Sequence, residues 1–254
     1  MSAATENTII KNGTRVVIEA GYEGSNYGVI YDGDIVQTIR SKENGTDYYI
    51  TLVSMDGDAF LNKGFVSFTL SKGMTARKVV EAIASKAKNP IEINSISEDL
   101  SKNKLTRGKT VFGLGTDYIK QLANSEKATA HVNSGKLNLV KVKDVAKGKI
   151  ISLSPETGLI GTPEQNEYGM SGKCLLNPQI DINSMIKIDN SLIRERKFEF
   201  GQLQRTLDAD GIYRIIKLFY VGDTRGTDWY VEFDTITQAG VFPSMLLTSA
   251  QNPW

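Results

Sequence analysis

Cysteine and histidine are almost missing from this chain of 254 residues, which has one of each. Cys174 has no partner for an internal disulfide, and with His131 it supplies too few ligands for a thiol–zinc site. We therefore expect no metal and no cofactor. Cys174 lies in an apolar run, which predicts a buried, inert thiol. His131 is interpreted as a surface or half-buried strand residue and not as a catalytic base.

Long apolar runs and an excess of charge of one sign are missing as well. No stretch of about 18 apolar residues predicts a transmembrane helix, and the polar start has no basic head that would indicate a signal peptide. Thirty Lys and Arg residues stand against 29 Asp and Glu residues, a net charge of +1. This balance favours neither nucleic acid nor an anionic membrane as a partner. We expect folding in a cytoplasm and no membrane insertion by this chain.

Glycine-rich nucleotide motifs are incomplete. Gly108-Lys109-Thr110 lacks the earlier glycine that a phosphate-binding loop requires. Gly113-Leu114-Gly115 precedes an expected helix, but Tyr118 occupies the place of the third glycine of a dinucleotide fingerprint. We interpret this segment as a tight strand-to-helix turn.

Acidic residues recur in pairs next to glycine, and each pair is interpreted as a solvated turn and not as a calcium loop. The pairs are Asp32/Asp34, Asp56/Asp58 and Asp208/Asp210. We predict no catalytic residues and no enzyme. A glycosidase could draw two carboxylates from anywhere in the chain, so that alternative stays open.

Short runs rich in Val, Ile, Thr and Tyr fill the first part of the chain and predict closely spaced antiparallel strands. The expected turns carry Asn-Gly or Asp-Gly, which tolerate positive φ. The strands are residues 14–20, 28–32, 35–40 and 47–55, and the turns are Asn12-Gly13, Asp32-Gly33, Asn44-Gly45 and Asp56-Gly57.

Helical periodicity appears in the middle of the chain. Residues 75–88 place their apolar side chains on one face, with Thr75 as the expected N-cap, and residues 116–125 predict a second helix. We expect a loop at residues 95–104. Two strands, 129–132 and 136–142, are expected to join through Asn133-Ser134-Gly135. The pattern is that of a small α+β unit.

Strand patterns return after residue 148, and residues 241–254 are interpreted as a C-terminal arm. The expected strands are 149–153, 169–176, 185–188, 211–221 and 228–236. The order is therefore β, α+β, β. It predicts a division into residues 1–72, 73–146, 147–240 and 241–254.

Four groups of segments, in collinear order, resemble the hub proteins of bacteriophage tails and baseplates. They are residues 19–35 (EAGYEGSNYGVIYDGDI), residues 55–61 (MDGDAFL) running through 65–70 into the helix at 75–88, residues 105–122 (LTRGKTVFGLGTDYIKQL), and residues 153–164 with 222–230 (LSPETGLIGTPE and GDTRGTDWY), between which lies CLLNP at 174–178.

The resemblance implies a mainly β fold with an α+β insertion: two tail-tube-like antiparallel β-barrels flanking a small α+β domain. It implies a homotrimer whose six barrels form a ring that joins the tail tube to a central spike. The implied partners are further copies of the chain, the tail tube protein, the spike and other baseplate or tail-tip proteins, with DNA only passing through the lumen. The implied location is the virion, with the host cytoplasm during tail assembly.

The sequence departs from the family at its start, where relatives carry more strands before the segment that matches residues 14–20. We therefore expect a first barrel that is incomplete, is completed by another chain, or comes from a truncated sequence.

Candidate contact residues follow from the resemblance. Amphipathic aromatics are enriched at interfaces, and arginine can form bidentate pairs across them. The candidate interface residues are Tyr22, Tyr27, Tyr31, Arg225, Trp229, Tyr230 and Trp254. The candidate lumen-facing residues are Arg194, Arg196 and Lys197.

Two other functions stay open: a tail-associated peptidoglycan hydrolase and a module that binds cell-surface glycans. The hydrolase would be a monomer that clears peptidoglycan turbidity. The glycan module would need clustered exposed aromatic side chains.

Overall fold

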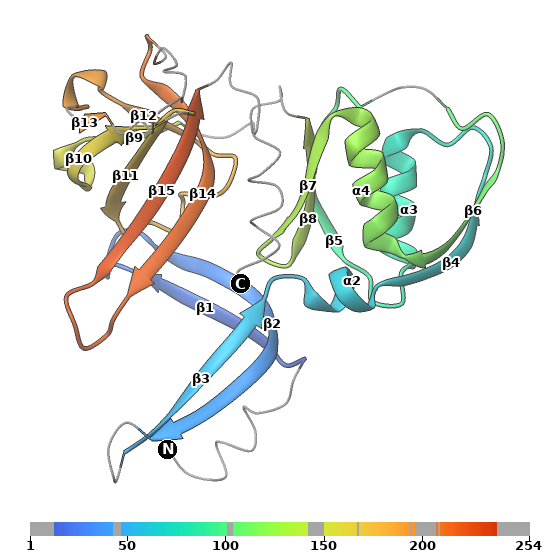
Figure 1. The fold of residues 1–254 in the computed structure, drawn as a ribbon, viewed down its shortest axis with the longest axis horizontal. Helices are drawn as coiled ribbons and strands as arrows, with labels where there is room; N and C mark the ends of the chain where they lie inside the picture. The colour runs from blue at the N-terminus through green and yellow to red at the C-terminus, as the bar shows by residue number, and fades with distance from the viewer. Residues whose placement is uncertain are drawn as a thin grey trace. The chain divides into compact units, whose positions relative to one another are not determined.

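The computed structural model of the protein describes residues 13–42, 47–100, 104–141, 150–166, 168–193, 195–196, 207 and 209–237. The described part of the chain is mainly β (Figure 1). It divides into two compact units. Unit 1 comprises Met1–Ile18 and Tyr31–Lys141, and unit 2 comprises Glu19–Ile30 and Val142–Trp254. The chain therefore contributes a short early segment to unit 2 before it builds most of unit 1.

The first three strands form one sheet in the order β1-β2-β3. They are β1 (Arg15–Gly21), β2 (Tyr27–Lys42) and β3 (Tyr48–Met55). The turn expected at Asp32-Gly33 is wrong, because β2 continues through it. Gly33 lacks the positive φ of a turn. A Cβ there would lie 2.3 Å from the Tyr31 hydroxyl, so glycine is required here for space.

The remaining elements of unit 1 are α2 (Asp58–Lys63), β4 (Phe65–Leu70), α3 (Ala76–Lys86), β5 (Glu92–Ile96), β6 (Lys109–Leu114), α4 (Gly115–Glu126), β7 (Ala128–Asn133) and β8 (Lys136–Lys141). The helices α3 and α4 lie side by side between a β4–β6 ribbon and a β5-β8-β7 sheet (Figure 1). Both expected helices and the β7–β8 hairpin are confirmed. Ser134 and Gly135 have φ of 50° and 73°, which a type I′ turn requires. The expected loop at 95–104 is wrong at its start, since β5 includes Ser95 and Ile96.

The core of unit 1 is built from the apolar faces of α3 and α4 and the inward sides of the two sheets. Val66, Val80, Val111 and Leu139 have no exposed surface, and Ile83 is 1% exposed. Burying each such side chain contributes about 1.5–3 kcal/mol. Spacing of three and four residues along α3 brings its buried residues onto one face.

The later part of unit 2 forms one seven-stranded sheet in the order β13-β10-β11-β15-β14-β12-β9. Its elements are β9 (Ile151–Leu153), η1 (Pro155–Thr157), β10 (Leu159–Gln165), β11 (Met170–Leu175), β12 (Met185–Ile188), η2 (Asn190–Leu192), β13 (Glu195–Arg196), β14 (Ile212–Gly222) and β15 (Trp229–Thr237). All five strands expected in this region are present. The strand β10 was missed because Gly161 and Pro163 interrupt its pattern.

The early segment Glu19–Ile30 completes the core of unit 2. Ala20 is 7% exposed and belongs to the same buried cluster as Ile186, Tyr213 and Val231. Tyr22 and Ile30 pack against that cluster as well. The β1–β2 hairpin end is therefore a structural part of a unit whose other strands begin more than a hundred residues later.

Candidate interaction surfaces

Two strand connections meet at one end of unit 2, between β1 and β2 and between β14 and β15, and we call them with their flanking strand ends the paired tips: residues 19–30 and 222–230. Trp229 links the two connections through two hydrogen bonds. Its indole Nε1–H donates to the Gly21 carbonyl at 3.3 Å, and its own carbonyl accepts from the Tyr22 hydroxyl at 3.2 Å. The indole ring packs directly against Gly222. A Cβ added to this glycine would lie only 2.8 Å from the nearest carbon of the ring. The structure thus brings two of the candidate interface residues, Tyr22 and Trp229, into direct contact.

The paired tips are rich in exposed carboxylates. Glu19, Glu23, Asp223 and Asp228 are exposed, and Arg225 is the one basic side chain within residues 19–30 and 222–230. Tyr27 is 63% exposed and its hydroxyl lies 3.3 Å from Glu19 Oε2. Asp223 Oδ1 accepts from the Arg225 amide at 2.8 Å, which shapes the second tip. The surface combines aromatic rings with net negative charge.

Tyr230 lies on a different surface, the side of β15 that alternates with its buried residues. The Lys173 ammonium lies 4.7 Å from the centre of its ring and 2.7 Å from Glu232 Oε1. The pair with Glu232 raises the pKa of Lys173. Leu175 and Phe219, 45% and 50% exposed, flank this pair in register. This surface therefore surrounds one exposed ion pair with exposed apolar side chains.

The other candidate residues are distributed differently. Tyr31 belongs to unit 1 and is partly buried, and burial raises the pKa of its hydroxyl. Arg196 is placed only by its backbone, in β13. Arg194, Lys197 and Trp254 lie outside the described residues.

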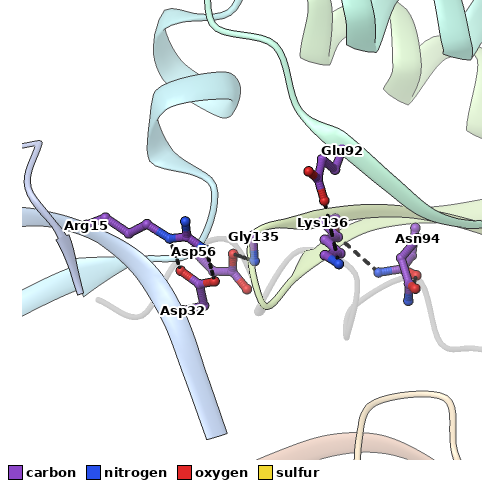
Figure 2. A network of polar contacts seen from close by, with 8 residues as sticks. Arg15, Asp32, Asp56, Glu92, Asn94, Gly135 and Lys136 are labelled. Carbon is purple, nitrogen blue, oxygen red and sulfur yellow. Dashed lines mark hydrogen bonds and ion pairs between the residues drawn. The ribbon is translucent and has the colours of Figure 1, made fainter. Parts of the chain in front are cut away.

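Acidic residues of unit 1 bind donors on a neighbouring strand and at the β7–β8 turn, as Figure 2 shows. Asp32 is 8% exposed and accepts from Arg15 Nε at 2.7 Å, and this bond lowers the pKa of the carboxyl. Asp56 Oδ1 accepts from the Gly135 amide at 2.8 Å, at the β7–β8 turn. Figure 2 shows both contacts close together, beside the pair of Lys136 with Glu92 at 3.5 Å.

The interpretation as solvated turns is therefore wrong for Asp32 and Asp34, which lie inside β2, and for Asp58, which is buried at the start of α2. Asp56 does lie in the expected turn at Asp56-Gly57. Asp34 accepts from the Ala59 amide at 3.2 Å, and Asp58 is 7% exposed and binds Asn62 and Lys63. These carboxylates bind backbone and side-chain donors inside unit 1, as a buried carboxylate such as that of Asp58 requires. Asp208 of the third pair lies outside the described residues.

An aromatic surface that the sequence did not indicate lies on the β4–β6 ribbon. Phe65, Ser67 and Thr69 of β4 face outward with Thr110 and Phe112 of β6, and we call this the β4–β6 outer face. Phe112 is 70% exposed and Phe65 is 40% exposed. Their rings form an edge-to-face pair with centres 5.0 Å apart and planes at 87°. The opposite side of the ribbon carries Val66 and Val111, which are buried against the helices.

Within the described ranges, no three His, Cys, Asp or Glu residues come close enough to hold a metal ion. Cys174 is 1% exposed, and burial raises the pKa of its thiol to about 12, as expected for an inert residue.

A hollow of about 580 Å³ is lined by residues 105–109, whose ionisable side chains are both basic. Among the described helices, none has the length and apolar character to cross a membrane.

Comparison with known proteins gives a family and a fold. The family model described as "Baseplate hub gp41" matches residues 2–194. No curated protein sequence matches the chain.

Three solved structures share the fold at low sequence identity. The 43 kDa tail protein of prophage MuSo2 from Shewanella oneidensis has a TM-score of 0.57 and 9% identity over 90% of this chain and 83% of its own. A tail protein from Neisseria meningitidis MC58 has a TM-score of 0.50 and 9% identity over 89% and 84%. The c3393 protein of E. coli has a TM-score of 0.54 and 10% identity over 90% and 66%. It is described as a component of the type VI secretion system with structural similarity to T4 bacteriophage tail proteins gp27 and gp5.

Proposed function

Because the chain belongs to the Baseplate hub gp41 family, we propose that it is a non-enzymatic structural subunit of a phage tail tip or baseplate. In this proposal, copies of the chain form a homotrimeric ring that joins the tail tube to the central spike. The protein works in the virion and assembles in the host cytoplasm. The observation that carries the proposal is the family match over residues 2–194, three quarters of the chain.

The proposed ring assigns a place to each part of the chain. The β1-β2-β3 sheet and the seven-stranded sheet are the described parts of two tail-tube-like barrels, at residues 1–72 and 147–240. The α+β domain at residues 73–146 is inserted between them, and residues 241–254 form a docking arm. Six barrels from three copies let a three-fold spike meet a six-fold tube.

The proposed contacts use the surfaces described above. The paired tips, with Tyr22, Tyr27, Arg225 and Trp229, present rigid aromatic rings and a polar rim, which suits a protein interface. Tyr31, Tyr230 and Trp254 are proposed as further contacts with copies, tube, spike or other baseplate proteins. Arg194, Arg196 and Lys197 are proposed to face a lumen through which DNA passes.

Measurement of mass and shape tests this function. Sedimentation of the purified chain is expected to give a mass near three times 27.9 kDa, and electron microscopy is expected to show a ring with a central hole. A turbidity assay on peptidoglycan is expected to show no clearing. A monomer that clears peptidoglycan would instead identify a hydrolase, and a monomer that binds surface glycans would identify a recognition module.

A further inference from the structure

Charge is divided unequally between the two units, although the whole chain is nearly neutral. Unit 1 carries 18 Lys and Arg residues against 13 Asp and Glu residues, and unit 2 carries 12 against 16. The basic excess is concentrated in residues 63–127, which hold 12 basic and 6 acidic residues. Surfaces of opposite sign on one chain favour contact between unlike surfaces of two copies.

The basic segment of unit 1 includes the β4–β6 outer face. Lys88 adjoins Phe65, since its amide donates to the Phe65 carbonyl at 2.9 Å, and its side chain is exposed. Arg107 is exposed and lies just before β6, at the other end of the ribbon, whereas Lys109 begins β6 and its ammonium lies 5.5 Å from the centre of the Tyr118 ring on α4. Cations therefore stand at both ends of a strip that carries two exposed phenylalanine rings.

The backbone of Phe112 is held in position by α4, while its ring contributes little to the core. The Tyr118 hydroxyl accepts from the Phe112 amide at 3.0 Å and lies 3.1 Å from its carbonyl, so α4 fixes this point of β6. The ring itself points away from the helices and is 70% exposed. An exposed aromatic ring on a fixed stretch of backbone suits a binding anchor.

The paired tips of unit 2 have the complementary character. They expose Glu19, Glu23, Asp223 and Asp228 beside the Tyr27 ring, with Arg225 as their one cation. Both surfaces combine aromatic side chains with charge, and the charges have opposite sign.

We propose that the β4–β6 outer face of one copy binds the paired tips of the next copy. The contact joins two different patches, so it is head-to-tail and closes into a ring when the rotation between copies permits. It rests on the proposed ring function and names the surfaces that build it. Its charged rim is exposed, so association weakens as salt rises and the Debye length falls below about 8 Å.

Charge reversal in the full-length chain tests this pairing. One variant reverses the face (Lys88→Glu with Arg107→Glu), a second reverses the tips (Glu23→Lys with Asp228→Lys), and a third carries all four changes. The control is Lys78→Glu with Lys120→Glu, which makes the same charge change at exposed positions of α3 and α4. Sedimentation equilibrium measures self-association, and circular dichroism melting shows that each variant is folded.

Each single reversal is expected to weaken self-association at least about tenfold, because like charges then meet. The variant with all four changes is expected to recover a self-association constant within about threefold of that of the original chain, since opposite charges meet again. The control is expected to leave association unchanged. Recovery in the variant with all four changes is the decisive result. If the first change had weakened association by unfolding the chain or by removing an unrelated contact, changing the charges of the second surface would not restore it.

An uncharged pair of variants tests the aromatic anchor and serves if a reversal disturbs folding. Phe112→Ser is expected to weaken association, and Phe112→Leu is expected to retain most of it, while both leave the Tyr118 bonds to the backbone intact.

The two levels of the proposal fail differently. If the original chain forms the ring and none of these variants weakens it, the pairing of these surfaces is refuted and the ring stands. If the original chain stays a monomer at every concentration, the ring itself is refuted.

Discussion

Trp229 is expected to hold the two connections of the paired tips together. Replacing it by alanine removes the ring that packs on Gly222 and the donor to the Gly21 carbonyl. A fully buried tryptophan costs about 3–5 kcal/mol on truncation, and Trp229 is only partly buried, so we expect about 2 kcal/mol. Trp229→Phe keeps most of the ring and loses one hydrogen bond, which costs about 1 kcal/mol.

Hydrogen exchange followed by mass spectrometry measures these losses locally. Because about 1.4 kcal/mol corresponds to tenfold, peptides covering Glu19–Ile30 are expected to exchange about thirtyfold faster in Trp229→Ala and about fivefold faster in Trp229→Phe. Phe219→Ala, on the partner strand but 50% exposed, is the control and is expected to change protection there by less than about 0.5 kcal/mol. Equal effects of the two Trp229 variants, or unchanged protection in Trp229→Ala, would refute the reasoning.

Three further predictions concern single residues. Cys174 is expected to resist iodoacetamide at pH 8 until the chain unfolds, because it is buried and its thiol pKa is about 12; rapid labelling of the folded chain would contradict this. Arg15→Ala is expected to lower the melting temperature at neutral pH, and the difference should shrink below about pH 4. Arg15 lowers the folded-state pKa of Asp32, so its contribution is present above the unfolded pKa and is lost as pH falls through the folded one; melting curves from pH 3 to 7 check this. Gly169→Ala is expected to destabilise unit 2 by about 1–3 kcal/mol in urea titration, because its Cβ would lie 2.6 Å from the Thr235 carbonyl oxygen, which belongs to the backbone and cannot rotate away.

Local patterns made much of the secondary structure predictable. The apolar spacing of α3 and α4 and the Ser134-Gly135 turn act over a few residues, so the sequence contains their whole cause. At Asp32-Gly33 the local pattern predicts the wrong structure. The same dipeptide that favours a turn lies inside β2, because Arg15 from another strand binds Asp32 and Tyr31 fills the space beside Gly33.

The candidate surfaces depended on contacts that no local pattern reveals. Tyr22 and Trp229 were each predicted as interface residues, but they are 207 positions apart and nothing in either segment indicates that they touch. The β4–β6 outer face was missed for a related reason. A pair of strands exposes one side only, and which side depends on where α3 and α4 pack.

The division of the chain into units predicts how its pieces fold. The buried apolar cluster of unit 1 that includes α3 and α4 lies entirely between Phe60 and Leu139, so residues 56–141 are expected to fold alone with a cooperative melt. Residues 142–254 lack the early segment Glu19–Ile30, whose Ala20 belongs to the core of unit 2. That fragment is therefore expected to aggregate, because the apolar surface that the segment covers becomes exposed.

Joining the early segment back to the later fragment tests whether that segment is the cause. A chain in which residues 19–30 precede 142–254 through a flexible linker is expected to recover a cooperative melt. The same chain with Ala20→Asp is the control and is expected to remain aggregated, since it places an unpaired charge in the buried cluster. If residues 142–254 melt cooperatively without the early segment, the end of the β1–β2 hairpin is an accessory to unit 2 and is not a required part of its core.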